Sequence, residues 1–232
     1  MTDILGALST NQAQTSSANV KTRTNLALHH LFAACRFSAK VKEIENANLG
    51  KKFSGFWEEI LHNSLGVATL SVAALESYAN EMYFEGAVLK PSMNASAAEE
   101  MASIIDRETI LKKYALALSI TTGKKLDLGI SVTQNVKALI EVRNAIIHFK
   151  PEWFGESDKH EKLSTALKKR FNASPFLANE PLFPLAWASH SFTVWALKTT
   201  INFIEHFHSE ADTESPLTQF KERLNEYSDG EI

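Results

Sequence analysis

The chain has 232 residues, of which 44% are apolar and 22% are charged, and its formal net charge is −3. This length allows one large hydrophobic core or at most two small domains, and the composition is ordinary for a soluble globular protein. The polar first twenty residues do not resemble a signal peptide. The longest apolar stretch, Leu65–Leu75, is too short for a bilayer span of about 20 residues. The single Cys35 excludes an internal disulfide, so we expect a cytoplasmic protein that does not bind membranes.

The charge is unevenly distributed along the chain. Seven acidic and two basic residues lie in residues 209–232, a net charge of −5, so residues 1–208 carry +2 of the total of −3. Compact basic spots occur at Lys112–Lys113, Lys124–Lys125 and Lys168–Arg170. Such spots are ordinarily solvated helix faces, and a cleft assembled from them in three dimensions is the alternative. No basic run is long enough to predict tight nonspecific binding to a nucleic-acid duplex.

Apolar residues recur at three- and four-residue spacing along most of the chain, which predicts an all-α protein. Residues 1–19 are expected to form a flexible polar tail. The predicted helices then span residues 19–46, 56–86, 97–120 with a break near Asp106, about 131–150 with a cap at Ser131 or Thr133, 185–208 and 216–227. The core-facing stripe of the first helix is assigned to Leu26, His29/His30, Ala33 and Phe37, and that of the second to Ile60, Ser64, Val67, Leu70, Ala74 and Tyr78.

The long helices and their mostly short connections favour an antiparallel up-and-down helical bundle. We expect residues 20–210 to form a single all-α domain, with an irregular insertion at residues 151–184. Residues 211–232 are expected to form an acidic C-terminal tail that includes a short helix. Four aromatic residues near the last long helix are expected to pack in the core rather than bind a ligand: Trp187, Trp195, Phe203 and Phe207.

The helix that ends before Pro151 carries Arg143, Asn144 and His148 within six residues. Arginine is suited to bidentate capture of a phosphate, and histidine can take up or release a proton near neutral pH. At 100° per residue, Asn144 and His148 lie about 40° apart, whereas Arg143 lies about 140° from His148 and faces the core. One chain therefore does not aim all three side chains at one point, but two copies across a twofold axis can share a cleft.

A purely structural role for these residues is one alternative. Arg143 would then pair with a core glutamate such as Glu76, and His148 would cap the C-terminus of its helix.

A metal centre is a second alternative, because Glu59–His62 and Glu205–His208 both read Glu-x-x-His. Two such pairs and two further glutamates make a di-iron carboxylate bundle, and Glu76 or Glu81 with Glu141 would complete it. Both pairs lie at helix ends, where solvent is normally reached. Surface charge is therefore the preferred interpretation, and no metal site is expected.

The segment Arg143-Asn144-x-x-x-His148 resembles the Arg-x(4–6)-His signature of the HEPN superfamily, including the polar residue that commonly follows the arginine. Residues 73–81 (AALESYANE) resemble the second helix of many HEPN proteins, and residues 110–116 (ILKKYAL) resemble the helix that precedes their motif helix. The resemblance covers roughly residues 20–210 in architecture.

The resemblance implies a HEPN-type bundle and a metal-independent endoribonuclease without cofactors, acting as a homodimer with a composite active site. His148 would be the general acid/base for attack of a ribose 2′-hydroxyl on its phosphate, Arg143 would stabilise the developing charge, and Asn144 would orient the phosphate or the histidine. Glu76 would support Arg143 from the second helix. The products would carry a 2′,3′-cyclic phosphate.

HEPN proteins act as toxins, phage-defence effectors or RNA-processing enzymes, and the resemblance therefore implies RNA as a partner and an antitoxin or nucleotidyltransferase as a further one. The alternative is a catalytically silent helical dimer that binds RNA, a nucleotide or a partner protein.

Overall fold

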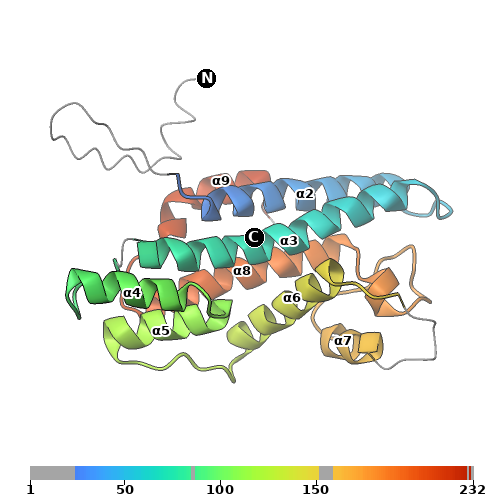
Figure 1. The fold of residues 1–232 in the computed structure, drawn as a ribbon. Coiled ribbons are helices and arrows are strands. Elements are labelled where there is room, and N and C mark those ends of the chain that lie inside the picture. Colours follow the sequence, from blue (N-terminus) through green and yellow to red (C-terminus); the bar gives the residue numbers. More distant parts are fainter. Residues whose placement is uncertain (1–23, 85–86, 152–158, 229, 231–232) are drawn as a thin grey trace.

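The computed structural model describes residues 24–84, 87–151, 159–228 and 230, and every regular element within them is helical (Figure 1). The prediction of an all-α protein is therefore confirmed. In chain order the elements are α2 (Ala27–Asn48), α3 (Phe56–Tyr83), α4 (Ala95–Ile105), α5 (Ile110–Thr122), α6 (Ser131–Ile147), α7 (Lys159–Leu167), the short helical turn η2 (Leu182–Ala186), α8 (His190–Glu210), the 3₁₀ turn η3 (Pro216–Phe220) and α9 (Lys221–Tyr227).

Four helices form the body of the protein, with α3 and α8 packed against each other and α2 and α6 on either side of them (Figure 1). The carboxylate of Glu45, near the end of α2, accepts a hydrogen bond from the backbone N–H of His190 at the start of α8 (2.8 Å), so these two helices are antiparallel. Tyr78 of α3 lies beside His208 of α8 (2.5 Å between Oη and Nε2), near the ends of both helices, so α3 and α8 run in the same direction.

The core between α3, α5 and α8 is built around Tyr114. Its ring is fully buried and packs edge-on against Phe203 and Phe207, at centroid distances of 4.8 and 5.1 Å. Its hydroxyl donates a hydrogen bond to the carbonyl of Leu75 (3.0 Å), which avoids the cost of an unsatisfied buried hydroxyl. The predicted core position of the four aromatic residues is also confirmed, because all are buried: Trp187, Trp195, Phe203 and Phe207.

The predicted buried stripe of the first helix is wrong. Leu26 and Phe37 are 50% and 39% exposed, whereas the buried face combines small and larger residues: Ala27, Leu31, Phe32, Ala34, Cys35, Ser38, Val41 and Ile44. Small side chains let neighbouring helices approach closely, and the hydroxyl of Ser38 donates to Thr193 Oγ1 of α8 at 2.7 Å. Phe37 instead lies over Gly66 of α3, where a Cβ atom would come within 2.7 Å of its ring.

Several predicted boundaries also shift. The break near Asp106 is confirmed, because α4 ends at Ile105 and α5 begins at Ile110. The predicted cap of the motif helix is wrong: Ile130 precedes α6, and the hydroxyl of Thr133 donates to the carbonyl of Asp127 instead (2.8 Å).

The last long helix begins at His190 rather than at residue 185, because the side chain of Ser189 accepts a hydrogen bond from the N–H of Phe192 (3.1 Å) and caps α8. The described part of the predicted irregular insertion contains α7, and residues 152–158 of it lie outside the described residues, as does the predicted tail of residues 1–19. The short helix expected near the C-terminus is present as η3 and α9, and α9 packs against α2.

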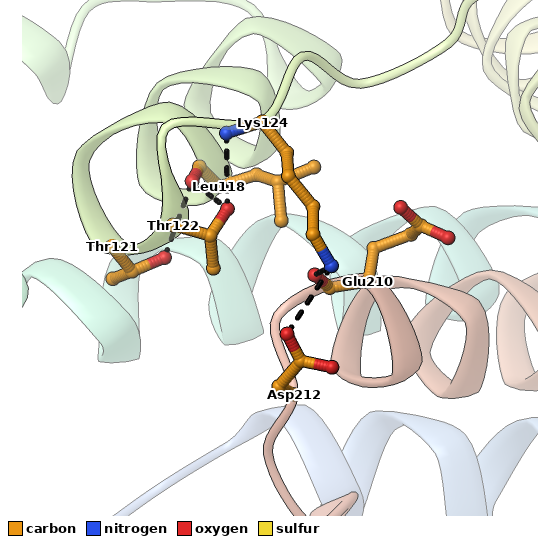
Figure 2. Close-up of polar contacts among 6 residues, drawn as sticks. All are labelled: Leu118, Thr121, Thr122, Lys124, Glu210 and Asp212. Atoms are coloured by element: carbon orange, nitrogen blue, oxygen red, sulfur yellow. Dashed lines mark hydrogen bonds and ion pairs between the residues drawn. The ribbon is translucent and has the colours of Figure 1, made fainter.

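Lys124 joins the C-terminal ends of α5 and α8 (Figure 2). Gly123 ends α5 with a positive φ of 73°, and the Nζ of Lys124 then donates to the carbonyl of Glu210 (2.7 Å) and lies 3.2 Å from the carboxylate of Asp212. A cation at a helix C-terminus is favoured by the helix dipole. The basic spot at Lys124–Lys125 therefore includes a structural contact.

We predict that Lys124→Met lowers the free energy of unfolding by about 1 kcal/mol, because the end of α8 loses its cation. Denaturant unfolding would measure the change, with Lys125→Met, an exposed neighbour, as the matched control. An equal effect of the two substitutions would contradict the role assigned to Lys124.

A partly buried hydrogen-bond chain lies at the same end of α8. The hydroxyl of Tyr78 is hydrogen-bonded to Nε2 of His208 (2.5 Å), and Nδ1 of His208 is hydrogen-bonded to the hydroxyl of Thr213 (2.7 Å). Burial lowers the pKa of His208. The folded protein takes up this proton less readily than the unfolded chain. The contribution of neutral His208 to the free energy of unfolding is therefore fully present above the unfolded histidine pKa of about 6.5. This contribution is lost as the pH falls from there through the folded pKa.

We predict that the free energy of unfolding of the wild-type protein decreases below pH 6.5 more steeply than that of His208→Gln. A single group can contribute a slope of at most about 1.4 kcal/mol per pH unit. Urea unfolding at a series of pH values would measure both slopes. His62→Gln, which removes an exposed histidine, should keep the wild-type slope, and identical slopes for His208→Gln and wild type would refute the prediction.

Candidate functional site

Helix α6 positions the three motif residues through its buried face. The buried residues of this helix are Thr133, Val136, Ala138, Leu139 and Val142. They pack α6 against α3 and α8. Arg143 lies at the edge of this face and is half-buried, so its predicted core-facing position is only partly correct. Asn144 and His148 are exposed. His148 follows the last residue of α6, and its backbone N–H donates to the carbonyl of Asn144 (2.9 Å).

Arg143 and Glu76 lie close together, with 3.7 Å between Nη2 and Oε2. The side chains are 24% and 48% exposed respectively, so the pair is observed but Glu76 is not the core glutamate that was expected. An ion pair at this distance and exposure contributes about 0–1 kcal/mol to stability. Its main consequence is that the guanidinium is oriented towards α3.

Arg143, Asn144 and Glu76 line a groove between α5 and α6 with a volume of about 730 Å³, which we call the α5–α6 groove. Its apolar lining includes Leu111, Ala115, Leu128 and Ile140. Its charges balance, with three carboxylates and three cations: Glu76, Glu108, Glu141, Lys112, Lys137 and Arg143. An anion therefore gains little from the net charge of the α5–α6 groove.

His148 lines a different hollow, of about 320 Å³, between the end of α6 and α7. The residues of this α6–α7 hollow are Glu141, Ala145, His148, Lys150, His160, Lys162 and Leu163. Among the described lining residues, two lysines and two imidazoles accompany one carboxylate, so this part of the α6–α7 hollow is more favourable for an anion than the α5–α6 groove.

The structure thus brings Arg143, Asn144 and Glu76 together and leaves His148 in the neighbouring hollow, which shares Glu141 with the α5–α6 groove. The separation of Arg143 from His148 agrees with their predicted positions on the helix. The expectation that Asn144 shares a face with His148 does not hold at the level of the cavities, because Asn144 lines the α5–α6 groove with Arg143.

Sequence reasoning missed Lys150, His160 and Lys162. Lys150 closely follows His148 in the sequence, beyond the end of α6. His160 and Lys162 lie on α7, and the packing of α7 near the end of α6 brings these two residues beside His148. The one local signal was Phe149, an exposed aromatic residue next to the motif. Its ring stacks on that of His160, with centroids 5.3 Å apart and an angle of 6° between the planes.

The residues of the di-iron alternative do not converge. Because α3 and α8 run in the same direction, Glu59 and His62 at the start of α3 lie at the opposite end of the bundle from Glu205 and His208. Both ring nitrogens of His208 are hydrogen-bonded within the protein. Over the described ranges 24–84, 87–151, 159–228 and 230, no group of three or more His, Cys, Asp or Glu side chains is arranged to hold a metal ion.

No family model matches this chain, and neither a curated protein nor a solved structure matches it. Among the helices that the structure describes, none combines the length and the apolar character needed to cross a membrane.

Proposed function

We infer that the protein is a metal-independent endoribonuclease of HEPN type that cleaves RNA by attack of a 2′-hydroxyl on the adjacent phosphate. The observation that carries this proposal is the position of His148. It is exposed at the end of α6 and lines a hollow whose other described residues include two lysines, a second histidine and one carboxylate. A proton acceptor in a site that attracts anions is what phosphodiester cleavage by a 2′-hydroxyl needs.

In this proposal His148 takes the proton from the 2′-hydroxyl, and Arg143 stabilises the negative charge that develops on the phosphate. Asn144 orients the phosphate from the same edge of α6 as Arg143. Glu76 orients the guanidinium, since its carboxylate lies 3.7 Å from Nη2 of Arg143. The products are a 2′,3′-cyclic phosphate and a 5′-hydroxyl, and the reaction uses no cofactor.

We propose a homodimer as the active form. His148 and Arg143 line different cavities of one chain, and a twofold axis near the end of α6 would place Arg143 of one copy beside His148 of the other. Two large exposed apolar residues at this end, Ile147 and Phe149, support an interface there. In the cell, such an enzyme fits a cytoplasmic toxin, phage-defence or RNA-processing role with an antitoxin or nucleotidyltransferase partner.

The second candidate is a catalytically silent dimer that binds RNA, a nucleotide or a partner protein. It is favoured by the α5–α6 groove, whose volume of about 730 Å³ and largely apolar lining suit a bound ligand.

We predict that the purified protein cleaves single-stranded RNA in EDTA and that His148→Ala lowers the rate by about 10²–10⁴-fold, the usual contribution of a general acid/base. Mapping of the cleaved ends should find 2′,3′-cyclic phosphates. His62→Ala, an exposed histidine of α3, is the matched control and should cleave at the wild-type rate. Full activity of His148→Ala would exclude the proposed mechanism.

For the homodimer, we predict that Arg143→Ala and His148→Ala are each nearly inactive but regain activity when mixed and allowed to exchange subunits. The mixed dimer contains one composite site with an intact arginine and an intact histidine. Cleavage assays before and after mixing would measure the recovery. A strictly monomeric protein, or a dimer that gains nothing on mixing, would rule out the composite site.

A further inference from the structure

We propose that His160 is a second catalytic residue, which protonates the 5′-oxygen leaving group while His148 takes the proton from the 2′-hydroxyl. This inference rests on the proposed ribonuclease function and assigns a general acid to it. Its basis is the α6–α7 hollow, where imidazoles from two different elements line one cavity of about 320 Å³. Ligand sites have volumes of roughly 300–1,000 Å³, so the hollow can receive a phosphate and part of its ribose.

The position of His160 is fixed by aromatic packing. Phe149 stacks on one face of its ring (5.3 Å, 6°), and Phe183 of η2 packs edge-on against it (5.3 Å, 68°). One turn further along α7, the hydroxyl of Ser164 accepts a hydrogen bond from the N–H of Phe183 (3.0 Å) and donates to its carbonyl (3.2 Å). These contacts fix α7 against η2 and hold the imidazole of His160 at the wall of the hollow. Because the side chain is already ordered, it loses little conformational entropy when the substrate binds.

The charge around the hollow suits a phosphodiester. Lys150 and Lys162 face it together with the two histidines, and Glu141 of α6 is the one carboxylate among its described lining residues. These described residues together carry a net positive charge even with both imidazoles neutral. In contrast, the α5–α6 groove has equal numbers of cations and carboxylates. The RNA backbone should accordingly enter the α6–α7 hollow, where Lys150 and Lys162 contact the non-bridging phosphate oxygens.

The step balances with two imidazoles and no further reactant. The 2′-oxygen forms a bond to phosphorus and its proton passes to His148, while the bond from phosphorus to the 5′-oxygen breaks and that oxygen takes a proton from His160. The products are the 2′,3′-cyclic phosphate and the 5′-hydroxyl. The reaction leaves His148 protonated and His160 neutral, and exchange with water restores both. Among the described lining residues, the charged groups that face the two histidines are Glu141, Lys150 and Lys162.

The test uses the full-length protein and one RNA oligonucleotide in two forms. The first has the normal 5′-oxygen at the mapped cleavage position, and the second has a bridging 5′-sulfur, a leaving group that departs without protonation. We expect His160→Gln to cleave the normal RNA about 10²-fold more slowly than wild type and to cleave the 5′-sulfur RNA at close to the wild-type rate. His148→Gln should be slow on both, and the control His62→Gln should match wild type on both.

Two results for His160→Gln overturn the proposal: unchanged cleavage of the normal RNA, or an equal loss on both RNAs, which would indicate a merely structural role. If His160→Gln does not fold, judged by circular dichroism, His160→Asn takes its place in the same comparison. Lys162→Gln changes an exposed side chain and should lower kcat/KM for the normal RNA about tenfold. An unchanged kcat/KM would contradict binding of the phosphate in the hollow. A wild-type protein that cleaves neither RNA would refute the ribonuclease function itself.

Discussion

The constraint on which the site depends is the packing of α6 against both α3 and α8. Val136, Leu139 and Val142 are completely buried in this contact, so α6 cannot rotate about its axis without exposing them. Its two flanks therefore have different neighbours: α5 and Glu76 of α3 on one side, and α7 near the end of the helix on the other. The same packing that stabilises the bundle thus assigns Arg143 and His148 to separate cavities.

The cavities differ in what they can bind. In the α5–α6 groove, Arg143 lies beside Glu76 and three cations face three carboxylates, so it is suited to a ligand that contributes apolar surface. Among the described residues of the α6–α7 hollow, cations outnumber carboxylates, which favours a phosphate there. An RNA-cleaving site formed by two copies of the chain would place Arg143 of one copy beside His148 of the other. In the proposed reaction, His148 takes a proton and His160 supplies one.

Local periodicity was enough to predict the all-α fold, the break near Asp106 and the short helix at the C-terminus, because each depends on neighbours in sequence. Periodicity failed for the buried face of α2. It assigned Leu26 and Phe37 to that face, but both are exposed, and Ser38 makes the hydrogen bond to α8. The pairing of Arg143 with Glu76 was expected as the structural alternative and from the HEPN resemblance. The approach of His160 to His148 could not be predicted, since it depends on how α7 packs near the end of α6 and on the aromatic contacts of Phe183.

We propose above all that an RNA phosphate binds in the α6–α7 hollow beside two histidines. The most direct measurement is NMR of the histidine ring signals during titration with a short RNA that carries a single 2′-deoxynucleotide at the cleavage position and so cannot react. The signals of His148 and His160 should shift together and saturate at the same RNA concentration, while those of His62 and His208, which lie outside the hollow, remain in place. Unchanged signals of His148 and His160 at saturating RNA would contradict the claim.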